Sequence, residues 1–90
     1  MNVVHEEKYQ QFTVVLGEDE AELAYAIPSE GVMNFTHTYV PAEARGEHVA
    51  DTLIKEGLRY AAEHKFKVMA ACPVVASFLK RHQEYQHLLA

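Results

Sequence analysis

Hydrophobic and polar residues alternate along three stretches in the first half of the chain, and clusters of turn-forming residues separate them. Period-two alternation bounded by glycine, proline and acidic residues is typical of strands joined by tight turns. The pattern predicts an antiparallel meander, preceded by a short edge strand. The predicted strands are Asn2 to His5, Tyr9 to Leu16, Glu20 to Ile27 and Val32 to Val40, and the turns are Gly17 to Asp19 and Pro28 to Gly31.

The last strand of this meander has two distinct sides if its alternation is strict. One side then carries Val32, Asn34, Thr36 and Thr38, and the other carries Met33, Phe35, His37 and Tyr39. Successive side chains of a strand point to opposite faces of its sheet. We therefore expect His37 and Tyr39 to share a face with Met33 and Phe35.

A long amphipathic helix is predicted from about Glu47 to His64, after Pro41 has ended the strand. Its apolar positions recur at helical spacing and comprise Val49, Ala50, Leu53, Ile54, Gly57, Leu58 and Ala61. A glycine inside this face costs roughly 1 kcal/mol of helix propensity relative to alanine. We expect Gly57 to allow a close approach of the helix to the sheet.

A strand from Lys67 to Cys72, a helix from Val74 to Arg81 and a short helix from Gln83 to Leu89 complete the prediction. Pro73 suits the first turn of the second helix. A strand–helix–strand unit forms a right-handed crossover, so the last two strands should be parallel neighbours. The predicted fold class is α+β, with a mixed sheet and one long packed helix, in a single domain over residues 1–90.

The charge distribution argues against nucleic-acid binding. The net charge is −5, and the acidic residues concentrate early, in Glu18, Asp19, Glu20 and Glu22. Nucleic-acid binding usually needs a clustered basic face. The basic residues lie later, at Arg59, Lys65, Lys67, Lys80 and Arg81, which favours the second half for an anionic ligand.

Cysteine use and hydropathy predict a cytoplasmic protein that does not cross membranes. The one cysteine, Cys72, rules out an internal disulfide and fits a reducing compartment. The longest apolar run, Val68 to Leu79, is too short to span a bilayer and contains Pro73. The six histidines are scattered without a metal-ligand motif, so we expect no metal site.

The segment from Thr36 to Ala50, THTYVPAEARGEHVA, predicts an anion site. It consists of a strand end, a proline, an Arg-Gly loop and a helix start. The first N–H groups of a helix lack intrahelical partners and carry a partial positive charge, so they bind phosphate well. By itself an Arg-Gly pair is also common in loops that bind nothing.

Together with the Cys-bearing strand that follows, this segment resembles the GNAT superfamily of N-acetyltransferases, and in particular its very short single-domain branch. The resemblance covers essentially the whole chain. The residues that carry it are His37 to Pro41, Arg45-Gly46, Cys72 and Arg81-His82. It implies acetyl-CoA or coenzyme A as the cofactor and a primary amine, on a small molecule or a peptide, as the acceptor.

In that superfamily a turn of the pattern Arg/Gln-X-X-Gly-X-Gly/Ala wraps the pyrophosphate with its amides. The six corresponding positions here are Arg45, Gly46, Glu47, His48, Val49 and Ala50. Arg45 and Ala50 match, whereas His48 replaces the central glycine. Its side chain either crowds the ligand or adds an N–H donor to the phosphate.

Other cofactor contacts are implied by the same resemblance. Tyr39 and Val40 would flank the pantetheine arm through their backbone groups. Arg81 and His82 would reach the phosphates of the nucleotide, or alternatively form only a basic turn that offsets the dipole of the second helix.

Two residues are candidates for catalysis. Cys72 corresponds to a proposed active-site cysteine of the short branch and precedes a helix N-terminus, which lowers the pKa of a thiol. Its roles are an acyl-accepting nucleophile or a wall of the acyl pocket, and the alternative is a small buried apolar residue. His37 is a candidate general base, because an imidazole can accept a proton near neutral pH, but a strand histidine also often only hydrogen-bonds a neighbour.

The sequence thus supports two hypotheses. The first is an acetyl-CoA-dependent N-acetyltransferase that acts on an unidentified primary amine, as a monomer or weak homodimer. The second is a CoA- or acyl-CoA-binding module with little or no catalysis, because larger relatives have additional elements around the acceptor site.

Overall fold

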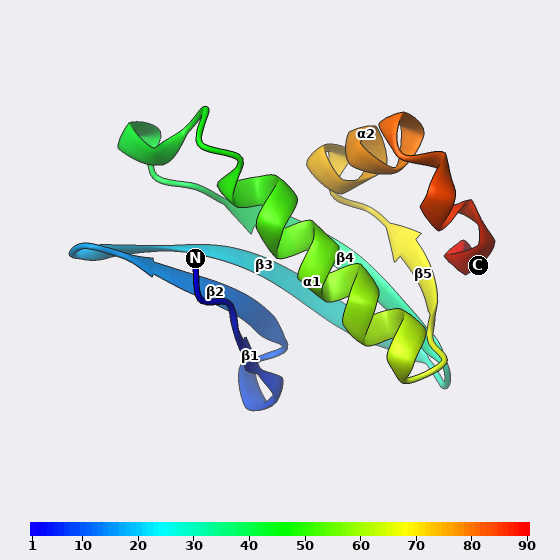
Figure 1. The fold of residues 1–90 in the computed structure, drawn as a ribbon. Coiled ribbons are helices and arrows are strands. Elements are labelled where there is room, and N and C mark those ends of the chain that lie inside the picture. The colour runs from blue at the N-terminus through cyan, green and yellow to red at the C-terminus, as the bar shows by residue number, and fades with distance from the viewer.

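The strands form one mixed sheet in which the order in space follows the order in sequence (Figure 1). The computed structural model describes residues 1–90. The strands are β1 (Val4–Glu6), β2 (Gln11–Leu16), β3 (Asp19–Ser29), β4 (Val32–Tyr39) and β5 (Lys67–Ala70). β1 to β4 pair antiparallel and β5 runs parallel to β4. The predicted meander, parallel pair and mixed sheet are confirmed.

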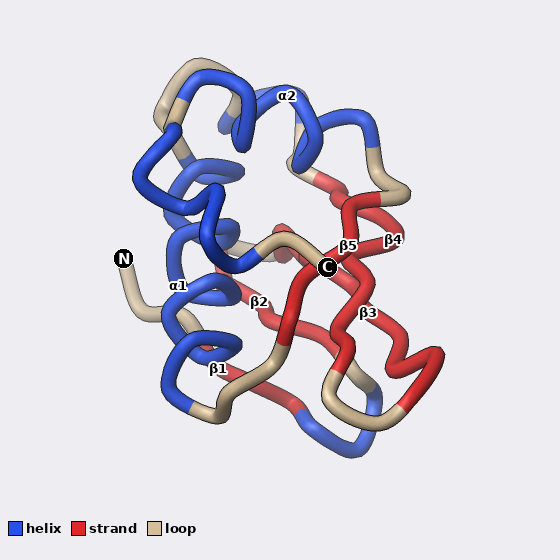
Figure 2. The backbone as a smooth tube through the Cα atoms, turned by 90° about the vertical axis from the view of Figure 1, so that its right-hand side faces the viewer, coloured by secondary structure: helices blue, strands red, loops and turns tan.

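Two α-helices and three short 3₁₀ segments accompany the sheet. The helices are α1 (Val49–Glu63) and α2 (Pro73–Arg81), and the 3₁₀ segments are Glu7–Tyr9, Ala42–Ala44 and Gln83–Leu88. α1 lies along one face of the sheet, α2 sits beside its end, and no α-helix lies against the other face (Figure 2). Neither α-helix has the length and apolar character needed to cross a lipid bilayer.

The core lies between α1 and the sheet, and Gly57 is at its closest point. Phe35 and Leu23 are fully buried beneath it. A Cβ atom added to Gly57 would lie 2.9 Å from Phe35 Cε1 and 3.1 Å from Leu23 Cδ2. The predicted close approach is confirmed, and it fixes how α1 sits over β3 and β4.

Each strand differs from its predicted range by one or two residues at one end or both, and two of these differences have a clear backbone cause. β2 begins at Gln11 because the residues before it form a 3₁₀ turn and Gln10 adopts a left-handed conformation with φ 53°. β3 continues through Pro28 to Ser29. Its pairing with β4 is irregular there, with a register shift between Ala26 and Ser29. Regular ladder pairing is already interrupted at such an irregularity, so a proline, which has no N–H to donate, is tolerated there.

A β-bulge at Thr36 reverses the predicted sides of the last part of β4. Ala24 pairs with His37 and Tyr25 pairs with Phe35, so Thr36 is an extra residue without a partner. Its hydroxyl donates to Ala24 O at 3.4 Å. The one-residue insertion shifts the alternation by one position.

The prediction that His37 and Tyr39 share a face with Phe35 is therefore wrong. Thr38 pairs directly with the buried Leu23 and faces α1, whereas His37 and Tyr39 lie on the opposite face. Strict alternation fails here because one residue of β4 has no counterpart in β3.

Candidate functional site

β4 and β5 separate after Phe35, which leaves one edge of β4 open. Their last paired residues are Phe35 and Ala70. Beyond them Ala71 N donates to Asn34 Oδ1 at 3.1 Å and Cys72 N donates to Phe35 O at 3.0 Å. The Cys72 thiol then reaches the Thr38 side chain, and α2 turns away from the sheet. β4 continues to Tyr39 with β3 as its only strand neighbour. The part of β4 after Phe35 can therefore hydrogen-bond a ligand along its backbone.

The start of α1 presents several N–H groups that have no protein acceptor. The first helical bond runs from Thr52 N to His48 O, at 3.0 Å. The preceding N–H groups of Val49, Ala50 and Asp51 make no hydrogen bond. His48, at the N-cap position, provides no side-chain cap. These donors form the kind of helix-terminal cluster that binds phosphate.

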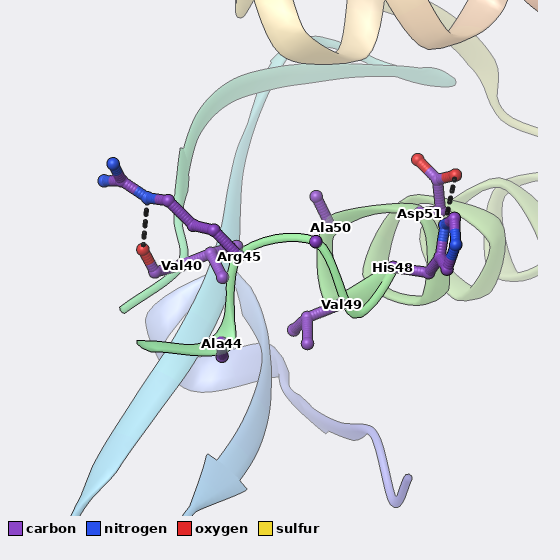
Figure 3. A pocket seen from close by; sticks show the side chains of 8 residues that line it. Val40, Ala44, Arg45, His48, Val49, Ala50 and Asp51 are labelled. Atoms are coloured by element: carbon purple, nitrogen blue, oxygen red, sulfur yellow. Dashed lines mark hydrogen bonds and ion pairs between the residues drawn. The ribbon is translucent and has the colours of Figure 1, made fainter. Parts of the chain in front are cut away.

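Two cavities adjoin at this helix start. One of about 230 Å³ is lined by Val40, Ala44, Arg45, Gly46, His48, Val49, Ala50 and Asp51 (Figure 3). The other, of about 260 Å³, is lined by Thr38, Tyr39, Val40, Arg45, Ala50 and Val74. Because three residues, Val40, Arg45 and Ala50, line both, the cavities form one groove from the open edge of β4 to the start of α1.

Arg45 lies at the junction of the two cavities with its cationic end available. Its Nε donates to Val40 O at 3.3 Å (Figure 3). Its two terminal nitrogens make no hydrogen bond or ion pair with the protein. Gly46 follows with φ +90°, which only glycine adopts without strain, and the exposed Glu47 makes no ion pair. The loop therefore offers one guanidinium with free terminal nitrogens in the same groove as the unpaired amides.

His48 has the backbone conformation that the glycine of the pattern would favour. Its φ is 62° and its ψ is 25°, in the left-handed region. This conformation delays the helix to Val49, two residues after the predicted start. The side chain is 83% exposed and its Nδ1 lies 3.8 Å from Asp51 Oδ2. In Figure 3 the imidazole and this carboxylate lie together, on the other side of the loop from Arg45.

Arg81 lies near the loop, whereas His82 packs within the C-terminal segment. Arg81 Nη2 is 3.9 Å from Asp51 Oδ1, which links the end of α2 to the start of α1. The His82 ring stacks on Phe78 with centroids 4.1 Å apart, and its Nδ1 lies 3.7 Å from Glu84. Neither Arg81 nor His82 lines the groove.

Cys72 is a buried thiol immediately before α2, beside the groove. Its Sγ lies 3.6 Å from Thr38 Oγ1, and Thr38 and Val74 separate it from the cavity space. Burial raises the pKa of Cys72. Hydrogen bonds from Val75 N–H, the Thr38 side chain and Val74 N–H outweigh burial and lower that pKa below its ordinary value. The thiolate is thus favoured by the helix start and by β4.

The two candidate catalytic residues lie on different faces of the sheet. Cys72 contacts Thr38, which faces α1, whereas the exposed His37 points to the opposite face. Tyr39 lies on that face as well, and its hydroxyl donates to Asp19 Oδ2 at 3.2 Å. His37 and Cys72 are therefore placed to act from opposite sides of the open edge, not as a directly bonded pair.

Four residues that line the groove had no role in the sequence analysis: Thr38, Ala44, Val74 and Asp51. Thr38 joins the groove because of the bulge, which has no signature in the alternation. Val74 follows Pro73 in the first turn of α2 and was assigned only to the helix. An aspartate in the first turn of α1 is a common helix-start signal, so Asp51 gave no reason to expect ion pairs with His48 and Arg81.

Comparison with known proteins places this chain in a family. A family model described as GCN5-related N-acetyl-transferase matches residues 11–88. The chain belongs to the GCN5-related N-acetyltransferase family. The resemblance seen in the sequence is confirmed, and N-acetyl transfer is the general activity of the family.

Relatives of this GCN5-related chain include vertebrate proteins of similar length. Protein NATD1 of Gallus gallus is 31% identical over 90 residues, covering 98% of this chain and 82% of that protein. Protein NATD1 of Homo sapiens is 30% identical over 90 residues, covering 98% and 80%. The solution NMR structure of a GCN5-like protein from Staphylococcus aureus has a TM-score of 0.76 at 22% identity, covering 99% of this chain and 87% of that chain. An identity this low shows a shared fold.

Proposed function

We propose that this protein transfers an acetyl group from acetyl-CoA to a primary amine. The observation that carries the proposal is the continuous groove between the open edge of β4 and the unpaired amides of α1. An extended molecule with a diphosphate at one end and an amide-containing arm at the other matches both halves of this groove. Family membership supports the same class of reaction.

The diphosphate of CoA would bind at the loop. The N–H groups of Val49, Ala50 and Asp51 have no protein acceptor, and Arg45 has free terminal nitrogens, so donors and charge suit an anion there. The pantetheine arm would pair with the β4 backbone at residues 37–40, where no other strand competes. Arg81 would approach the nucleotide phosphates from the end of α2.

Bound acetyl-CoA supplies an activated thioester. The chain's own contribution to direct transfer would be to orient this carbonyl and stabilise the charge that develops on its oxygen, through backbone N–H groups of β4. The exposed His37 would accept the proton of the attacking amine, directly or through water, while the new amide bond replaces the carbon–sulfur bond of the thioester and CoA leaves as its thiolate. An amine would then approach from the face that no helix covers.

A covalent route through Cys72 is the second candidate mechanism, and the lowered pKa of its thiol favours it. The thiolate would take the acetyl group from CoA before passing it to the amine. Cys72→Ser and Cys72→Ala distinguish the two routes. Loss of turnover in both variants with CoA binding retained would support the covalent route, and turnover within about tenfold of the wild type would support direct transfer.

Calorimetric titration with CoA, acetyl-CoA and desulfo-CoA tests the proposed binding site. We expect micromolar binding to the wild type that weakens at least tenfold in Arg45→Ala, because a charge-assisted contact to phosphate is lost. Arg59→Ala is the matched control, since Arg59 pairs with Glu56 and Glu63 on α1 and does not line the groove. An absence of binding at millimolar ligand would contradict the proposal.

A panel of primary amines and peptide N-termini then separates an enzyme from a binding module. Acetylated product that requires both acetyl-CoA and the protein would support the transferase. Binding of CoA without any product across the panel would instead support a CoA-binding module.

A further inference from the structure

In the loop from Arg45 to Ala50, His48 occupies the position at which the motif has its central glycine. A side chain at this position can occupy the space that a phosphate needs. The left-handed backbone of His48, φ 62°, is the conformation that favours glycine, and the N–H groups that follow it have no protein acceptor. A histidine there adds an imidazole beside these donors. Because His48 itself lines the 230 Å³ cavity, the direction of its imidazole decides how much of that space a ligand can use.

Two further residues account for where the imidazole lies. Asp51, one turn along α1, places Oδ2 3.8 Å from His48 Nδ1. Its other oxygen, Oδ1, lies 3.9 Å from Arg81 Nη2 at the end of α2. The Asp51 side chain is only 28% exposed, so it has less freedom than the exposed side chains on either side of it. A chain of contacts therefore runs from α2 through α1 to the loop.

We propose that Asp51 is a positioning residue for the cofactor loop: it holds the His48 imidazole away from the anion site, and Arg81 in turn orients Asp51. This inference rests on the proposed CoA site at the start of α1. The ion pair with Arg81 also offsets the negative charge of Asp51, which would otherwise repel a diphosphate nearby. When Asp51 holds the imidazole aside in this way, the loop can bind an anion with histidine at the position where the motif has glycine.

The proposal makes a prediction that is opposite to a simple charge effect. If Asp51 acted only through its charge, its removal would strengthen CoA binding whatever residue stood at position 48. If it holds the imidazole aside, its removal weakens binding in the presence of His48 and has no such effect when glycine stands there. A double-mutant cycle measures this difference directly.

The experiment is calorimetric titration of CoA into the wild type, His48→Gly, Asp51→Ala and the double variant, with thermal unfolding of each. Glu43→Ala is the control. Glu43 lies in the preceding 3₁₀ segment, and its exposed carboxylate forms no ion pair and does not line the groove. Surface ion pairs of this kind contribute up to about 1 kcal/mol, which corresponds to a change in Kd of about fivefold.

We expect Asp51→Ala to weaken CoA binding about two- to fivefold more in the His48 background than in the His48→Gly background. Arg81→Gln should change binding in the same direction by less. Equal effects of Asp51→Ala in both backgrounds would overturn the proposal while leaving the CoA site established. Binding by His48→Gly but not by the wild type would overturn it too, because His48 would then block the loop. No binding by any variant would refute the proposed function and this inference together.

Discussion

The two ends of α1 differ in how completely the surrounding residues pack against them and satisfy their hydrogen bonds. At its N-terminal end, His48 is held in a left-handed conformation, three N–H groups lack acceptors and two cavities meet. At its C-terminal end, the Tyr60 ring contacts His5 edge-on at 4.3 Å and stacks on His64 at 4.1 Å. His5 also stacks on Phe12 at 4.2 Å. One end is left open, and the other is filled with aromatic rings.

This contrast shows how a thin core can support a site whose backbone N–H groups have no acceptor in the protein. The closed end ties three elements together, since His5 comes from β1, Phe12 from β2 and Tyr60 from α1. A hydrogen bond between His5 Nε2 and Tyr25 OH, 2.6 Å long, adds β3 to this cluster. A helix fixed firmly at one end can present free donors at the other without fraying, as a preorganised binding site requires.

The largest expected effect is on stability, from Phe12→Ala at the closed end. Phe12 is fully buried and contacts the rings of His5 and Tyr25, so its loss should cost about 3–5 kcal/mol of unfolding free energy. Urea unfolding measures this. CoA affinity of the folded fraction should stay within about twofold of the wild type, and a parallel loss of affinity would show that the two ends are not separable.

A moderate effect is expected from Gly57→Ala, between the two ends. The added Cβ would lie 2.9 Å from a ring carbon of Phe35, which is fully buried and has no space to move into. Overpacking should outweigh the gain of roughly 1 kcal/mol in helix propensity and leave a net destabilisation of about 1–2 kcal/mol. Chemical denaturation checks the sign, and a stabilised variant would mean that α1 shifts easily on the sheet.

A smaller effect of opposite sign is expected at the open end. His48→Gly should increase the unfolding free energy by about 0.5–1 kcal/mol, because glycine adopts the left-handed conformation without a steric penalty but loses more entropy on folding. Thermal unfolding monitored by circular dichroism would detect the increase. A destabilised variant would indicate that the ion pair between His48 and Asp51 contributes more than the backbone strain costs.

The smallest expected effect is a pH dependence at the closed end. Burial lowers the pKa of His5 from its ordinary value of 6.5, and this outweighs the opposing influence of Glu7. Since the unfolded chain then binds the proton more readily, the contribution of neutral His5 is present above about pH 6.5 and is lost as the pH falls toward the folded-state pKa. Unfolding free energies measured across this window should decline on acidification, and less so in His5→Phe.

Most of the fold could be predicted from the spacing of hydrophobic, glycine and turn-forming residues along the sequence. Alternation and turn residues predicted the meander, the position of Gly57 predicted the close approach of α1, and the crossover rule predicted that β5 is parallel to β4. These features arise from repeated local preferences that several residues express together. The errors at Gln11 and Pro28 concern single boundary residues, where one conformation or one irregular pair decides the outcome.

The site was less predictable because it depends on departures from pattern. Arg45 and Ala50 were found through a motif, and the structure places both on the groove. Thr38 was missed because a bulge is not visible as periodicity. The contact of Asp51 with Arg81 was missed because it joins residues on two different helices, and spacing along the chain carries no information about it. The contact with His48 is a local one between residues three apart, and helical spacing could have indicated it.

The bulge at Thr36 divides β4 into two segments that can be engineered separately. Before it, Met33 and Phe35 face α1, and after it Thr38 takes that direction although its position in the sequence has the opposite parity. Deleting Thr36 would exchange the surroundings of His37 and Thr38 while leaving the rest of the amino-acid sequence unchanged. Designers who graft this strand onto another scaffold must therefore transfer the interruption itself, because the same side chains in a regular strand would present the wrong surface to a ligand.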